Sequence, residues 1–370
     1  LTGCDPGKHG IFDFTRRVPG EYRLELTNAT HRSVPTFNRV LSERGLRSAS
    51  VAFPTTYPPE AIDGVVISGF DSPVATSIDG RFCHPRALYK EIVERFGGMA
   101  FADFQELEIE PGWHEQALES LLKEIPRKEA IATWLLEQER WEVFSLLFGE
   151  SDTVSHHFWM FHDPDSPRYR DEPALRAAIE KVYCALDSTL GRLIEEAQPE
   201  WVCIASDHGF GGSGDRVIHL NRFLEEHGWL QYRRDPFEKG SQGIRSGSGL
   251  LDRAKAKALR VLPPKAQQQL VRALPNRLVS AVESSSRYGN IDFSHTRAFS
   301  DEMNYAATIH LNVAGRDKDG VIENRDAAIE ALKTLLLGWE IQGEKVVRSV
   351  SRREDVYRGE MVHYAPDLIL

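Results

Sequence analysis

The sequence has few cysteines, and none of them are spaced as pairs. Four of its 370 residues are cysteines, and no two form a CxxC pair; they are Cys4, Cys83, Cys184 and Cys203. This spacing excludes a zinc ribbon and gives no sign of a disulfide framework. Since disulfides are rare in reducing compartments, the cysteine usage favours a cytoplasmic protein. We expect Cys184 and Cys203 to be small buried residues of predicted core elements.

Long apolar runs and excess positive charge are also lacking. No run reaches the roughly 20 apolar residues that a transmembrane helix needs, so the sequence predicts no membrane span. The formal net charge of -10 argues against nonspecific binding to duplex nucleic acid. What the chain does have is 41% hydrophobic and 27% charged residues, which is typical of a globular protein with a sizeable core.

Both ends of the sequence are abrupt. The chain starts on Leu1 without an initiator methionine, and its last residues, 365–370, resemble the beginning of a strand. We therefore expect an internal fragment of a longer protein, from which localisation signals have been lost.

Short apolar runs predict the strands of an α/β fold. Residues 143–148 and 201–205 are two such runs, and similar ones cover 48–53, 64–69, 305–313 and 345–350. Residues 171–199 between the first two have apolar side chains at helical spacing, at Leu175, Ile179, Val182, Leu186, Leu190 and Leu193. The pattern predicts a β-α-β unit, whose right-handed crossover would place both strand ends at one edge of a parallel sheet.

The two runs at 143–148 and 201–205 are each followed by an Asp/His pair. Asp152 and His156 would share a helix face if residues 151–157 begin a helix. Asp207 and His208 directly follow the second run, and Gly209 allows a sharp turn beneath them. Taken alone, Asp207 and His208 are better explained as a helix-capping aspartate followed by a loop histidine than as metal ligands. Two pairs at one sheet edge favour a two-metal centre, the kind that binds the attacking and leaving oxygens at phosphorus.

Residues 209–214 match the glycine pattern GxGxxG, which is typical of dinucleotide-binding sites. However, the next predicted helix starts only near Asn221, so the glycine loop does not open a helix. The dinucleotide interpretation is therefore discounted.

Three stretches together resemble a known family. They are Thr2-Gly-Cys-Asp-Pro-Gly-Lys-His-Gly-Ile11, Asp152-Thr-Val-Ser-His156 and Asp207-His208-Gly209, with weaker support from residues 54–59, 220–224 and 365–368. The chain resembles the alkaline phosphatase superfamily, in its type I phosphodiesterase/nucleotide pyrophosphatase branch. The resemblance implies an alkaline-phosphatase-like three-layer α/β sandwich with a mostly parallel central sheet. One catalytic domain would cover residues 1–370, truncated at both ends, with cap insertions at 72–141 and 211–300.

The same resemblance implies a site with two divalent metal ions, Zn²⁺ or else Mn²⁺. Its ligands here would be Asp152, His156, Asp207 and His208. A Thr or Ser nucleophile is expected upstream of Leu1, and a further histidine ligand beyond Leu370. The parent protein would hydrolyse phosphate esters such as nucleotides or other phosphodiesters, and the fragment alone would be inactive. A phosphomutase of the same superfamily and an inactive binding or scaffold protein are the alternatives.

Overall fold

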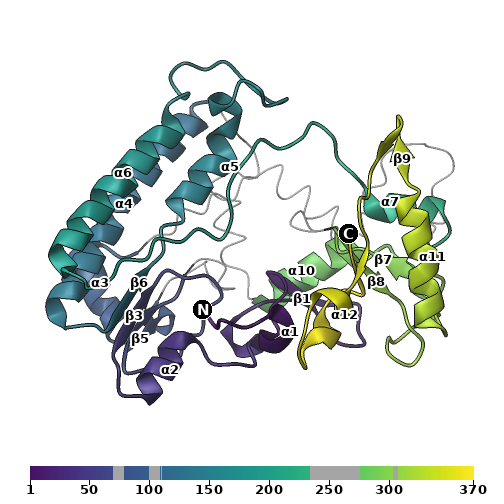
Figure 1. Ribbon diagram of the computed structural model, residues 1–370, viewed down its shortest axis with the longest axis horizontal. Coiled ribbons are helices and arrows are strands. Elements are labelled where there is room, and N and C mark those ends of the chain that lie inside the picture. The colour runs from purple at the N-terminus through teal and green to yellow at the C-terminus, as the bar shows by residue number, and fades with distance from the viewer. Residues whose placement is uncertain (70–78, 100–108, 110, 234–275, 303–306) are drawn as a thin grey trace. The chain divides into compact units, whose positions relative to one another are not determined.

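The computed structural model of the chain describes residues 1–69, 79–99, 109, 111–233, 276–302 and 307–370. These residues form two compact units, each drawn in Figure 1. The first unit contains Leu1, Asn28–Thr30 and Pro35–Val217. The second contains Thr2–Thr27, His31–Val34 and Ile218–Leu370. Parts of both predicted cap insertions, 72–78, 100–108, 110 and 234–275, lie outside the described residues, and the single domain with cap insertions stays a prediction.

The first unit is built on a mostly parallel sheet with the strand order β5-β4-β3-β6. Strands β3 (Ser48–Val51), β4 (Gly64–Ile67) and β6 (Val143–Leu146) run parallel, while β5 (Cys83–His84) is antiparallel to β4. Every residue of β3 is buried, as expected for a parallel strand that is covered on both faces. The predicted α/β class with a mostly parallel central sheet is confirmed.

Helices cover this sheet and then pack on one another. Against it lie α2 (Phe37–Glu43), α3 (Leu88–Phe96) and α4 (Trp113–Gln138), the last two through Ile92 and Ile131. Helices α4, α5 (Glu150–His162) and α6 (Ala178–Ala197) lie side by side in Figure 1. The helix predicted within 171–199 is confirmed, and Ile179, Val182 and Leu193 from its apolar stripe are buried.

Residues 201–205 do not form the predicted strand. They have no regular secondary structure and no strand partner among the described residues, and Trp201 and Ile204 are 85% and 74% exposed. The prediction of a buried strand here is wrong, because a strand needs a neighbour for its backbone hydrogen bonds and a short apolar run does not reveal that neighbour. Cys184 and Cys203 are exposed, so the prediction that they are buried is also wrong.

The second unit has an antiparallel sheet with the order β11-β12-β8-β7. Its strands are β7 (Ala298–Phe299), β8 (Thr308–Leu311), β11 (Ser351–Arg352) and β12 (Leu368–Ile369). Two hairpins accompany it, β1 (Thr15–Arg17) with β2 (Leu24–Leu26), and β9 (Glu340–Ile341) with β10 (Glu344–Lys345). The predicted strand within 305–313 is confirmed in β8, whereas the one at 345–350 is wrong, since only Lys345 belongs to a strand.

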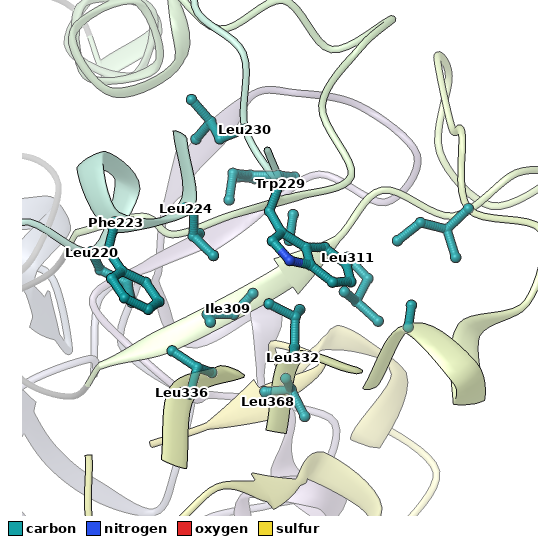
Figure 2. Close-up of a cluster of buried hydrophobic side chains, with 14 of the residues drawn as sticks. Leu220, Phe223, Leu224, Trp229, Leu230, Ile309, Leu311, Leu332, Leu336 and Leu368 are labelled. Atoms are coloured by element: carbon teal, nitrogen blue, oxygen red, sulfur yellow. The ribbon is translucent and has the colours of Figure 1, made fainter. Parts of the chain in front are cut away.

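The second unit also contains α-helices. They are α1 (Pro6–His9), α7 (Leu220–Glu226), α10 (Asn276–Tyr288), α11 (Arg325–Leu337) and α12 (Arg353–Val356). Figure 2 shows Leu224 of α7, Ile309 of β8 and Leu332 of α11 pointing into one apolar cluster. All three side chains are fully buried. Removal of this apolar area from water is the main term that stabilises such a cluster.

Candidate metal site

Helix α5 presents the first predicted pair of ligands. The chain leaves β6, passes Gly149 and enters α5 at Glu150, so Asp152 lies in the first helical turn. Asp152 and His156 are four residues apart and therefore share a face of the helix. His156 Nε2 lies 3.5 Å from Asp152 Oδ1, and both side chains are about half exposed. Val154 and Phe158 on the other side of α5 are fully buried, which fixes the rotation of the helix.

The second predicted pair comes next to the first. His208 Nε2 lies 3.8 Å from the same Asp152 Oδ1 and 3.9 Å from Asp207 Oδ1. The Asp152 carboxylate thus lies between two imidazole rings, and Asp207, with a 91% exposed side chain, stands on the solvent side of His208. The structure brings Asp152, His156 and His208 together, and Asp207 contacts this group through its neighbour His208.

Aromatic contacts hold the segment after His208 against α5. The ring of Phe210 stands edge-on to His156, with centroids 4.8 Å apart, and lies 5.4 Å from the ring of Trp159. Because His156 and Trp159 are successive residues of one helix face, Phe210 packs over that face. Sequence reasoning missed Phe210, which stands among glycines without any periodic pattern.

A close backbone approach continues this packing. At Gly212 a β-carbon would lie 2.7 Å from Ser166 Oγ, so only glycine fits there without a shift. Two residues later, Arg168 Nε donates a hydrogen bond of 2.9 Å to the Gly214 carbonyl. Packing of residues 210–214 on α5 and the loop after it therefore places His208, and no strand at 201–205 is required.

The orientation of the His208 ring follows from its backbone contacts. Nδ1 lies 2.7 Å from the Gly209 carbonyl, and since a carbonyl only accepts, Nδ1 carries the proton. In the neutral ring this leaves the lone pair on Nε2, which faces Asp152, the arrangement typical of a metal-binding histidine. The Gly209 hydrogen bond and the charges of Asp207 and Asp152 raise the pKa of His208.

His157 shows the opposite environment one residue from His156. His157 lies about 100° further around the helix than His156. It packs edge-on against Trp113, with the ring centroids 5.2 Å apart. Burial, helped by the charge of His156, lowers the pKa of His157 to about 4. His157 is therefore neutral at pH 7 and belongs to the packing between α4 and α5.

The donor chemistry fits a divalent cation. Asp152 Oδ1 is buried and has no hydrogen-bond partner, which is costly for a carboxylate oxygen unless something else binds it. Two ligands of one tetrahedral zinc ion lie about 3.3 Å apart, close to the 3.5 Å and 3.8 Å measured here. Within the described ranges no three His, Cys, Asp or Glu side chains are arranged to bind one ion together. The structure thus shows ligand-type side chains close to one another, without a complete metal-binding arrangement among the described residues.

One family model matches this chain, over residues 1–359, and its description is type I phosphodiesterase / nucleotide pyrophosphatase. The chain belongs to this family. The resemblance seen in the sequence is confirmed. Since the match covers nearly all 370 residues, it gives no support to the expectation of a fragment. No curated protein and no solved structure matches the chain.

Membership in the type I phosphodiesterase/nucleotide pyrophosphatase family sets the chemical class of the site. The family consists of hydrolases that act on nucleotides and other phosphodiesters and are generally metal-dependent. Asp152, His156, Asp207 and His208 are carboxylate and imidazole groups of the kind such chemistry requires.

Among the described residues, no helix is long and apolar enough to cross a membrane.

Proposed function

We propose that this chain is a metal-dependent hydrolase of phosphate esters whose metal ligands are Asp152, His156, Asp207 and His208. One observation carries the proposal: Asp152 Oδ1 lies 3.5 Å and 3.8 Å from the Nε2 atoms of His156 and His208. Two divalent cations suit this mixture of carboxylate and imidazole donors; Zn²⁺ is the first candidate and Mn²⁺ the second. Bound there, such a cation would favour deprotonation of a hydroxyl nucleophile and offset charge on the phosphoryl oxygens.

Each of the four residues has a distinct task. Asp152 and His156 are held by one helix face, so their relative position is fixed by the helix itself. His208 is oriented by its Nδ1 hydrogen bond to Gly209, which keeps Nε2 toward Asp152. Asp207 supplies the most exposed carboxylate of the group. A Thr or Ser nucleophile stays a prediction.

Metal binding tests the proposal directly. Zinc and manganese titrations of the purified chain should show binding that His156→Ala weakens by about tenfold or more. His162→Ala is the matched control, because His162 lies on the same helix in an exposed position away from the four ligands. Asp207→Asn should weaken binding in the same way, with the exposed Asp215→Asn as its control. Equal affinities for the His156 and His162 variants would refute the assignment.

Product analysis separates the hydrolase from its alternatives. Release of alcohol and phosphate monoester from an activated phosphodiester, dependent on Asp207, identifies a hydrolase. Transfer of the phosphoryl group to a second hydroxyl of the substrate identifies a phosphomutase. Metal and nucleotide binding without turnover, in a protein that also carries the nucleophile, identifies a binding or scaffold protein.

A further inference from the structure

A buried carboxylate lies at the start of the helix that carries Asp152 and His156. Glu150 is the first residue of α5, and it is 0% exposed. A charged side chain is almost never fully buried without a partner, because removing it from water is costly. Its burial therefore requires a compensating group.

The compensating group is a buried lysine of helix α4. Lys128 is 3% exposed, and its Nζ lies 2.8 Å from Glu150 Oε1. Lys128 Nζ also lies 5.9 Å from the centre of the Phe148 ring, on the segment that leads into α5. Neither oxygen of Glu150 accepts a well-directed hydrogen bond from another described residue. The ion pair with Lys128 is thus the contact that balances the charge of Glu150.

Helix geometry makes Glu150 and Asp152 point in opposite directions. At about 100° per residue, a separation of two residues places side chains on opposite sides of a helix. Glu150 accordingly faces α4, whereas Asp152 faces the candidate metal site and is 41% exposed. A shift of Glu150 toward or away from Lys128 would rotate or translate the first turn of α5, and Asp152 would move with it.

Local hydrogen bonds at the start of α5 run from Ser151 Oγ to the Phe148 carbonyl and from Thr153 Oγ1 to the Gly149 carbonyl. The residue before α5 is Gly149, which provides no side-chain hydrogen bond to the first turn. Helix starts without such a cap depend on tertiary contacts for their position. At α5 those contacts are the buried Val154 and Phe158 and, in the first turn, the pair of Glu150 with Lys128.

We propose that Glu150, held by Lys128, is a positioning residue that sets where Asp152 and His156 stand in the metal site. The proposal rests on the metal-binding function proposed above. Outer residues that orient metal ligands typically change metal affinity by about 10- to 100-fold when they are replaced. Glu150 would act in this way through the helix backbone, without touching the cation.

The test combines single and double substitutions in the full chain, with zinc affinity and thermal stability as separate readouts. Glu150→Gln and Lys128→Met each leave the other partner buried without its ion pair, so both Tm and zinc affinity should fall. Lys128→Met/Glu150→Leu replaces the pair by apolar side chains of similar size, which often restores stability. In this double variant we expect a Tm near that of the unaltered chain, with zinc affinity still weakened by about tenfold.

A neighbouring ion pair provides the control. Glu129 follows Lys128 on α4 and pairs with Arg192 of α6 at the surface, with 2.5 Å between Glu129 Oε1 and Arg192 Nε. Glu129→Gln should leave zinc affinity unchanged.

Two results would overturn the proposal, and they are distinguishable. Zinc affinity that returns to its original value in the double variant would mean that the pair only stabilises the fold. If the unaltered chain binds no zinc that depends on Asp152, the proposed function fails, and the positioning role fails with it.

Discussion

The contact between Gly212 and the loop after α5 can be tested by adding one carbon atom. In Gly212→Ala the new β-carbon would lie 2.7 Å from Ser166 Oγ, 3.1 Å from Ser166 Cβ and 3.3 Å from Trp159 Cδ1. Rotation of the hydroxyl relieves the first contact but not the other two. Since Ser166 is 8% exposed and held within a turned loop, the segment that carries Gly212 is the part that must move.

The expected size of the effect follows from these distances. Restoring an ordinary contact of at least 3.4 Å requires a movement of a few tenths of an ångström at Ser166 Cβ. Overpacking of this kind costs about 1–3 kcal/mol. Gly→Ala also removes conformational freedom from the unfolded chain, which offsets about 0.4–1 kcal/mol. The net loss of unfolding free energy should be about 1 kcal/mol.

The displacement should also reach the metal site, because His208 is only four residues before Gly212. We expect the zinc affinity of the Gly212→Ala variant to fall by about tenfold. Urea unfolding and zinc titration measure the two effects. Gly211→Ala is the matched control, since nothing lies within 4 Å of its added carbon. Ser166→Gly in the Gly212→Ala background removes the nearest contacting atoms and should restore most of both properties.

The reasoning would be refuted by a Gly212→Ala variant that matches Gly211→Ala in both measurements. Residues 210–214 would then not pack on α5 as described, and another interaction would have to place His208.

Two further predictions concern ionisable groups outside the site. Burial raises the pKa of Asp367, but the hydrogen bonds and charge of Arg316, whose Nη1 lies 2.7 Å from Asp367 Oδ1, hold it well below 3.8. Stabilisation from Asp367 is therefore present above about pH 4 and lost as the pH falls further toward its folded-state pKa. Asp367→Asn should lower the unfolding free energy at neutral pH, measured by urea unfolding, by about 3 kcal/mol. The unfolding free energy of this variant should also fall less steeply as the pH is lowered. An unchanged urea midpoint would contradict the role of Arg316. Burial raises the pKa of Cys83 to about 12, so iodoacetamide at about pH 8 should label the exposed cysteines of the folded chain but not Cys83. Rapid labelling of all four thiols before unfolding would contradict this burial. The exposed cysteines are Cys4, Cys184 and Cys203.

Local patterns in the sequence were sufficient for the helix that carries half of the site. The apolar run before Gly149 predicted β6, and the spacing of Asp152 and His156 predicted a shared helix face. The prediction of the helix face holds because helix periodicity is a property of consecutive residues and needs no distant partner. The stripe of α6 was predictable for the same reason. The prediction of β6 holds because the run pairs with β3, a partner that the run itself did not reveal.

The sequence placed Asp207 and His208 near the first pair for the wrong reason. A buried strand at 201–205 was expected to bring His208 to the sheet edge, yet that segment is exposed and unpaired in the described structure. His208 instead reaches Asp152 because Phe210 and Gly212 pack on α5 and the loop after it. Strand pairing and loop packing join residues far apart in the chain, so no local pattern reveals them.

The sequence by itself therefore determined which side chains carry the chemistry and which of them share a helix. It also indicated the family, through stretches from residues 2–11 to 365–368, and the family model that matches residues 1–359 confirms it. Only the tertiary structure decided that Asp152 lies between His156 and His208, and that Glu150 is buried against Lys128 of another helix. The physical reason is that a charge is buried or exposed according to the partners that folding brings to it, and those partners are not its neighbours in sequence.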